Sequence, residues 1–183
     1  MTVTIAKWTV EQYHQMITAG VLENRSVELL NGEILEMSPE GEPHAYYSHE
    51  AAKYLERKLG NRATVRQSKP ITIKASESEP EPDLAIVQPL GRVYLTHHPY
   101  PENIFWVIEF SQSSLGKDLE IKADTYAQAG IEEYWLINLR TLVLIIFRNP
   151  IEGKYQSQTR HTQGMITPIA FPDVQVSVTD LLT

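Results

Sequence analysis

Residues 104–111, with the sequence IFWVIEFS, are the most apolar strand-like stretch of the chain and decide where its sheet is centred. Strands that are buried on both faces have continuous apolar sequences, so we expect this strand in the middle of a sheet. Glu109 interrupts the run, and the two-residue period of a β-strand puts it on one face with Phe105 and Val107. A buried ionised carboxylate costs several kcal/mol unless a positive group compensates it. Glu109 therefore predicts a cationic partner, and we favour a functional role for it.

A second acidic residue stands in front of another apolar strand. In EPDLAIV, residues 81–87, Asp83 follows Pro82 and directly precedes the strand. If the two strands are neighbours, Asp83 and Glu109 converge near one end of the sheet. Mg²⁺ prefers oxygen ligands, typically one or two carboxylates together with water. Asp83 alone is explained equally well as a residue that begins a strand after a turn.

The helix expected over residues 115–130, LGKDLEIKADTYAQAG, carries the candidate partner of these acids. Asp118, Lys122 and Tyr126 are spaced i, i+4 and i+8, so they share one face of that helix. An ion pair on a solvated surface would explain the pattern by itself. However, the helix follows the Glu109 strand after a short connection. A lysine on its inward face could reach Glu109 and stabilise negative charge on a phosphate.

The remaining chain predicts one α/β domain over residues 1–183, with a mixed central sheet, a few flanking helices and additional β-hairpins. The Asn31-Gly32 pair predicts a tight hairpin, because both residues tolerate positive φ. The acidic stretch 76–82 is expected to be an exposed loop. The other expected elements are helices over 9–20 and 43–60, hairpins over 26–39 and 132–150, strand material over 63–74 and a β-rich tail over 154–182.

Composition narrows the possible functions. The chain has no cysteine, which excludes disulfides and thiolate metal sites and fits a cytoplasmic protein. No apolar run approaches the roughly 20 residues of a membrane helix, and the first residues do not have the pattern of a secretory signal. The net charge of -7 argues against a general nucleic-acid binder, although an enzyme with a local acidic metal site remains compatible with it. No phosphate-cradling glycine loop is present, so we expect no organic cofactor.

Three stretches together carry a family resemblance. They are residues 27–44, VELLNGEILEMSPEGEPH, residues 81–87, and residues 107–138, VIEFSQSSLGKDLEIKADTYAQAGIEEYWLIN. In this order they resemble the Uma-two family of bacterial restriction-endonuclease-like proteins, which is similar in fold to the PD-(D/E)xK nucleases. The resemblance is clearest over residues 8–150. It implies a restriction-endonuclease-like fold, DNA as the substrate and a homodimer.

The resemblance also implies roles for single residues. Asp83 matches the aspartate of the Pro-Asp motif and Glu109 the acidic residue of the (D/E)xK motif, both metal ligands. Ser111 stands where the simple pattern has its lysine, and a serine supplies no positive charge. The family pattern resembles one in which the lysine has moved to the following helix, which indicates Lys122 as the third catalytic residue.

Two further positions match residues that the family tends to carry. Glu28 matches an acidic residue of the early hairpin and is expected as a further metal ligand or as a residue that orients one; a solvent-facing strand position would also explain it. His44 matches a histidine at the start of the next helix, where the polarity of a helix N-terminus is an alternative explanation. Asp118 and Tyr126 remain possible members of the site.

Two functions of different classes follow. The first is a metal-dependent endonuclease in which Asp83 and Glu109 hold Mg²⁺ or Mn²⁺ and Lys122 stabilises the phosphate. The second is a nuclease-like fold that has lost cleavage and acts as a binding or assembly module. Ser111 and the acidic net charge favour the second function, and the presence of the three candidate catalytic residues favours the first.

Overall fold

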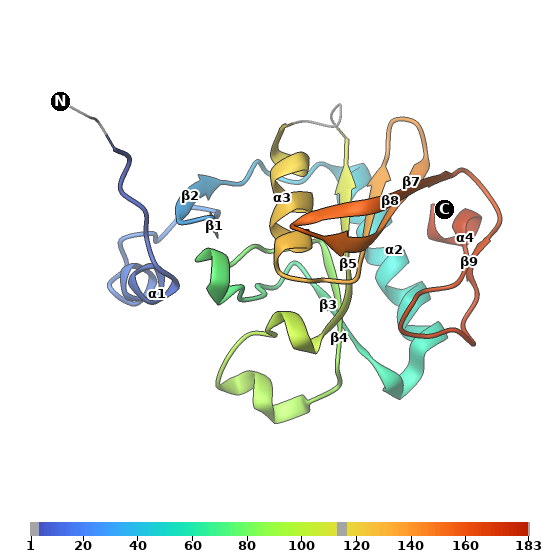
Figure 1. Cartoon of the computed structure of the whole chain (residues 1–183), viewed down its shortest axis with the longest axis horizontal. Helices are drawn as coiled ribbons and strands as arrows, with labels where there is room; N and C mark the ends of the chain where they lie inside the picture. The colour runs from blue at the N-terminus through green and yellow to red at the C-terminus, as the bar shows by residue number, and fades with distance from the viewer. Residues whose placement is uncertain (1–3, 113–116, 183) are drawn as a thin grey trace.

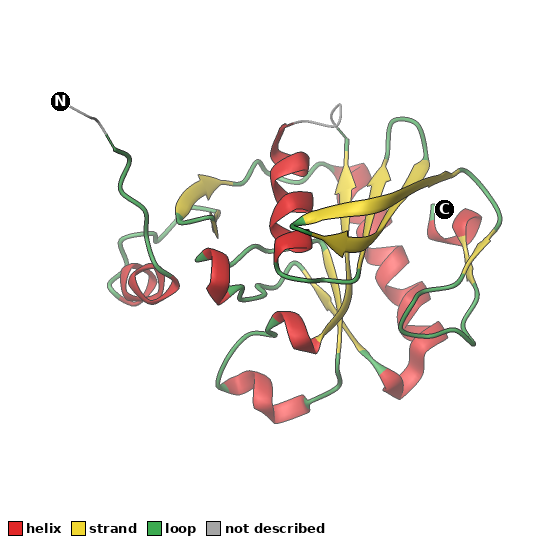
Figure 2. Ribbon diagram, in the orientation of Figure 1, coloured by secondary structure: helices red, strands yellow, loops and turns green. Residues whose placement is uncertain are grey.

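The central element is a six-stranded mixed sheet with the strand order β3-β4-β5-β6-β7-β8 (Figures 1 and 2). The computed structural model describes residues 4–112 and 117–182, with the side chains of residues 117–119 outside that description. Only β5 and β6 run parallel, and all other neighbours are antiparallel. The strands are β3 (Thr64–Gln67), β4 (Leu84–Val87), β5 (Ile104–Ser111), β6 (Glu133–Asn138), β7 (Val143–Ile151) and β8 (Lys154–His161).

Helices cover the two faces of this sheet (Figure 1). On one face, α2 (Glu42–Leu59) packs with α4 (Val178–Leu181) over a core that contains Trp106 and Trp135. On the other face, α3 (Lys117–Gln128) places Tyr126 against Val107, Tyr134, Leu136 and Ile145. The expected mixed sheet with few helices is therefore confirmed, and β5 is buried at its centre.

The N-terminal part lies beside the sheet (Figure 1). Helix α1 (Val10–Thr18) begins with a capping box in which Thr9 and Gln12 bond each other's backbone N–H. Strands β1 (Val27–Leu30) and β2 (Glu33–Glu36) form the expected hairpin, and its turn residues Asn31 and Gly32 have φ values of 52° and 76°. This turn fixes the position of Glu28 on β1.

The smaller elements complete the chain. They are the short 3-10 helices at Gly60–Arg62, Lys74–Ser76, Gly91–Leu95 and Pro101–Asn103, and the two-stranded pair of β9 (Met165–Ile166) and β10 (Val176–Ser177). None of the helices in the described part of the chain has the length and hydropathy that crossing a bilayer requires.

The acidic stretch 76–82 is not an exposed loop, contrary to the expectation from its composition. Ser78 and Glu79 are buried, and Glu79 forms a bridge with Leu29 of β1. The Glu79 carboxylate accepts hydrogen bonds from Thr72 Oγ1 at 2.7 Å and lies 2.7 Å from His14 Nε2. These partners satisfy the carboxylate, so it can stay inside the protein.

The prediction that Phe105 shares a face of β5 with Val107 and Glu109 is also wrong. Ile86 pairs with Trp106 but Val87 pairs with Ile104, so the register shifts and Phe105 is an extra residue in β5. A bulge of this kind breaks the two-residue period. Phe105 therefore packs against Phe171, with ring centroids 5.0 Å apart, on the α2 side of the sheet.

An ion pair between a buried glutamate and a partly exposed arginine joins the start of β6 to β7. Glu133 is fully buried, and its Oε1 accepts hydrogen bonds from Arg148 Nη2 at 2.6 Å and from Trp135 Nε1 at 2.7 Å. We expect Arg148→Met to lower the free energy of unfolding by about 3–5 kcal/mol, because it leaves the Glu133 charge buried without its cation. Urea denaturation measures this change.

The matched control is Arg25→Met. Arg25 donates to Glu36 from Nε and Nη2, the two nitrogens that Arg148 also directs at Glu133. In the Arg25–Glu36 pair, however, both side chains are exposed. Exposed pairs contribute at most about 1 kcal/mol, so the control loses that amount or less. Equal losses of unfolding free energy in the two variants would contradict the structural role of the Glu133–Arg148 pair.

Candidate active site

The pairing of β4 with β5 brings two acidic side chains together. Leu84 pairs with Ile108, so Asp83 stands opposite Glu109 one position further along the two strands. Asp83 Oδ2 accepts a hydrogen bond of 2.6 Å from the backbone N–H of Phe110. This bond holds the Asp83 carboxylate against the strand that carries Glu109. The two acids thus converge at the carboxyl end of β5.

Helix α3 adds two side chains to Glu109. Tyr126 donates its hydroxyl hydrogen bond to Glu109 Oε1 at 2.8 Å, and Lys122 Nζ donates to the same oxygen at 3.2 Å. Lys122 and Tyr126 are four residues apart, so one face of α3 presents both. Glu109 and Tyr126 are buried. The side chain of Asp118, which the sequence places on this face, lies outside the described residues.

Glu28 approaches Lys122 from the β1 hairpin. Its Oε2 lies 3.2 Å from Lys122 Nζ and accepts a hydrogen bond of 3.1 Å from the backbone N–H of Glu81. Glu28 is buried, which excludes the solvent-facing position that its strand pattern allowed. The ammonium of Lys122 therefore lies between oxygens of two carboxylates, one from β1 and one from β5.

Burial and charge shift the pKa values in this cluster. Burial raises the pKa of Glu109 to about 7; the Lys122 ammonium opposes that rise, and the charges of Asp83 and Glu28 add to it. Burial alone would lower the pKa of Lys122, but the carboxylates of Glu109, Glu28 and Asp83 together raise it. Lys122 is therefore a cation at neutral pH. Among the described side chains, Glu28 and Glu109 contact this ammonium and Asp83 adds a third negative charge nearby, so acidic groups outnumber the lysine.

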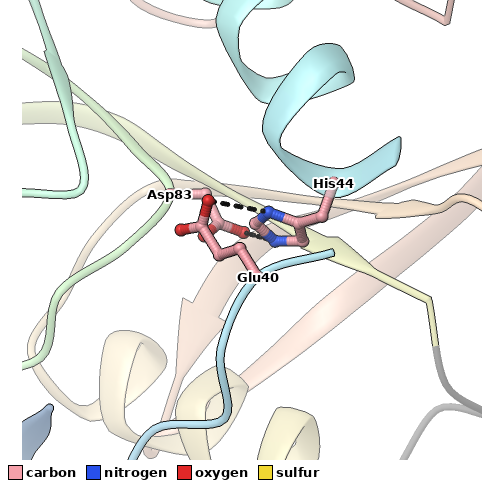
Figure 3. Close-up of side chains that lie close together, drawn as sticks. All are labelled: Glu40, His44 and Asp83. Atoms are coloured by element: carbon pink, nitrogen blue, oxygen red, sulfur yellow. Dashed lines mark hydrogen bonds and ion pairs between the residues drawn. The ribbon is translucent and has the colours of Figure 1, made fainter. Parts of the chain in front are cut away.

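His44 and Glu40 extend the cluster on the side of Asp83 (Figure 3). His44, from the first turn of α2, places Nε2 3.1 Å from Asp83 Oδ2 and Nδ1 3.5 Å from Glu40 Oε2. The hydrogen bond to Asp83 raises the pKa of His44, and burial opposes that rise. One ligand atom from each of Glu40, His44 and Asp83 lies within 4.8 Å of the others, a spacing that a metal ion could bridge.

Glu40 is the site residue that sequence reasoning missed. Its available signal was the four-residue spacing to His44. Glu40 precedes α2 and its side chain is 44 % exposed, so the apolar periodicity of the strands and helices did not indicate it. Ser111, two positions after Glu109, is buried at the end of β5. The cation beside Glu109 accordingly comes from α3, not from β5.

The arrangement has the chemistry of a site for a hard cation. Its donors are carboxylate oxygens and one imidazole, and carboxylates are the ligands that Mg²⁺ and Mn²⁺ take in proteins. The lysine adds a hydrogen-bond donor with a fixed positive charge next to those oxygens. Such a pairing of acidic ligands with an ammonium can place a negatively charged group between them.

Comparison with known proteins identifies the family and the fold of the chain. The Uma2 family, described as "Putative restriction endonuclease", matches residues 10–179. A crystal structure of a "putative nuclease belonging to DUF820" from Anabaena variabilis superposes with a TM-score of 0.75 at 14 % sequence identity, covering 95 % of this chain and 97 % of that chain. At this identity the likeness supports the fold. No curated protein matches the chain significantly. The fold is therefore nuclease-like, as the sequence predicted, and the chain belongs to the Uma2 family.

Proposed function

We propose that this protein is a metal-dependent endonuclease that hydrolyses phosphodiester bonds in DNA. The observation that carries the proposal is the convergence of Asp83, Glu109 and Lys122 at one end of the sheet, within a cluster that has more acidic than basic groups. Membership in the Uma2 family, described as "Putative restriction endonuclease", supports a nuclease over other hydrolases.

Asp83 and Glu109 are the proposed metal ligands. They fit a cation because Glu109 is buried beside two other carboxylates, a situation that raises its pKa and that a divalent ion would relieve. A bound Mg²⁺ or Mn²⁺ polarises a phosphoryl oxygen and lowers the pKa of its water. The backbone N–H of Phe110 and the Tyr126 hydroxyl keep the two carboxylates in their orientations.

Lys122 is the proposed stabiliser of the phosphate. Its ammonium is adjacent to Glu109, so a phosphate group that reached this acid would also meet the lysine. Negative charge that develops on the phosphate during attack is stabilised by a donor that is already in place. His44 Nε2 lies 3.1 Å from Asp83 Oδ2, and His44 is proposed as a residue that orients this ligand.

Two observations support the alternative of an inactive binding module. The ammonium of Lys122 is engaged by two carboxylates, and Ser111 stands at the position where the simple nuclease pattern has its own lysine. A lysine held only for structure would leave the fold intact without catalysis. This alternative predicts no cleavage of DNA, with or without a divalent metal.

A plasmid-nicking assay separates the two functions. Supercoiled DNA is incubated with the purified protein and Mg²⁺ or Mn²⁺, with and without EDTA. The proposal predicts nicked product with metal and none after chelation. Without the metal, the carboxylates supply no Lewis acid that could polarise a phosphoryl oxygen. Absence of nicking with either metal, from protein that has a cooperative thermal transition, would favour the binding module.

A further inference from the structure

We infer that Glu28 is a positioning residue for Lys122, holding its ammonium at the phosphate side of the site while Glu109 binds the metal. The inference rests on the proposed function, and it differs from both roles expected from the sequence, a metal ligand or a residue that orients one. Glu28 acts through its ion pair with Lys122, in which Oε2 lies 3.2 Å from Nζ.

The contacts of Glu28 show how it is held in place. Its Oε2 accepts from the backbone N–H of Glu81 at 3.1 Å, and its side chain is only 6 % exposed. Strand β1 is held next to Glu28 by two pairings. Glu28 itself pairs with Leu35 of β2, and the neighbouring Leu29 forms a bridge with Glu79. Glu28 is thus a fixed acceptor, whereas Lys122 is attached through a long, flexible stem.

Competition at Glu109 explains why a second anchor is needed. Oε1 of Glu109 already accepts from Lys122 and Tyr126. A divalent cation bound by Glu109 would compete with the ammonium for this carboxylate and repel it. Lys122 would then depend on Glu28 to stay near the phosphate. A displacement of about 1 Å in a catalytic group can lower a rate by about 10²-fold.

The test is a double-mutant cycle of Glu28→Gln and Lys122→Met, measured by DNA cleavage and by Mn²⁺ calorimetry. We expect Glu28→Gln to lower kcat by about 10- to 100-fold and to change the Kd for Mn²⁺ by no more than about threefold. In the Lys122→Met background, Glu28→Gln should cause no further loss, because its effect passes through the lysine. Independent, multiplying losses in the double variant would overturn the inference.

The matched control is Glu33→Gln on the neighbouring strand. Glu33 pairs with Lys7 at 2.8 Å, but both side chains are about half exposed. This variant should match the wild type in cleavage and in Mn²⁺ affinity. If Glu28→Gln lacks a cooperative thermal transition, Glu28→Asp supports the same comparison, because it keeps the charge and withdraws it by one methylene.

Failure of the inference is distinguishable from failure of the proposed function. If the wild type cleaves DNA and Glu28→Gln loses Mn²⁺ affinity as strongly as Asp83→Asn, Glu28 is a metal ligand and the positioning role is wrong while the nuclease stands. If the wild type neither binds Mn²⁺ nor cleaves DNA, both are wrong.

Discussion

Replacement of Asp83 by asparagine is expected to lower DNA cleavage by about 10³-fold. Asparagine keeps an oxygen that can accept from the Phe110 N–H, so the local backbone should be unchanged. It removes the negative charge that a hard cation requires from its ligand. Metal-ion stabilisation of the transition state is worth several kcal/mol, and each 1.36 kcal/mol is tenfold in rate, which gives the expected loss. Initial rates of plasmid nicking measure it.

The control for this variant is Asp173→Asn. Asp173 pairs with Arg62 at the surface, and its side chain is 67 % exposed. It should cleave DNA at the wild-type rate. Cleavage by Asp83→Asn within a few-fold of the wild type would mean that Asp83 is a turn residue and not a metal ligand.

The second large effect is expected for Lys122→Met, which should lower kcat by about 10²- to 10³-fold. Methionine fills the space of the lysine stem but supplies no positive charge, and the loss of one charge-stabilising donor has effects of this size in other enzymes. Mn²⁺ should bind this variant at least as tightly as the wild type, because Glu28 and Glu109 no longer share an ammonium. Cleavage kinetics and calorimetry measure the two quantities separately.

Lys154→Met provides the comparison for the lysine. Lys154 forms an ion pair with Asp124 of α3, so it contacts the same helix from an exposed position. Unchanged cleavage is expected for it. If Lys122→Met nicks DNA as fast as the wild type, the lysine of α3 has not replaced the one that is absent at position 111.

Local sequence signals predicted much of the fold. The Asn31-Gly32 turn acts over a few residues, and the structure has it where the sequence placed it. The continuous apolar run of β5 predicted its central place in the sheet, because a strand that is buried on both faces has an apolar sequence throughout. The i,i+4 spacing likewise put Lys122 and Tyr126 on one helix face, and both contact Glu109.

Features that depend on distant partners were not predictable in this way. Glu40 reaches His44 and Asp83 through an irregular segment that has no period to count. Glu79 is buried because Thr72 and His14 satisfy its carboxylate, and the composition of residues 76–82 carries no trace of those partners. The bulge that turns Phe105 to the other face comes from the pairing with β4, not from the sequence of β5 alone.

The central claim is that the acids at the end of β5 bind a divalent cation, and a calorimetric titration of Mn²⁺ into the metal-free protein tests it most directly. The site described above predicts saturable binding to the wild type and its loss in Asp83→Asn, with both proteins folded. No binding at millimolar Mn²⁺, or equal binding by the two proteins, would contradict a metal site at Asp83 and Glu109.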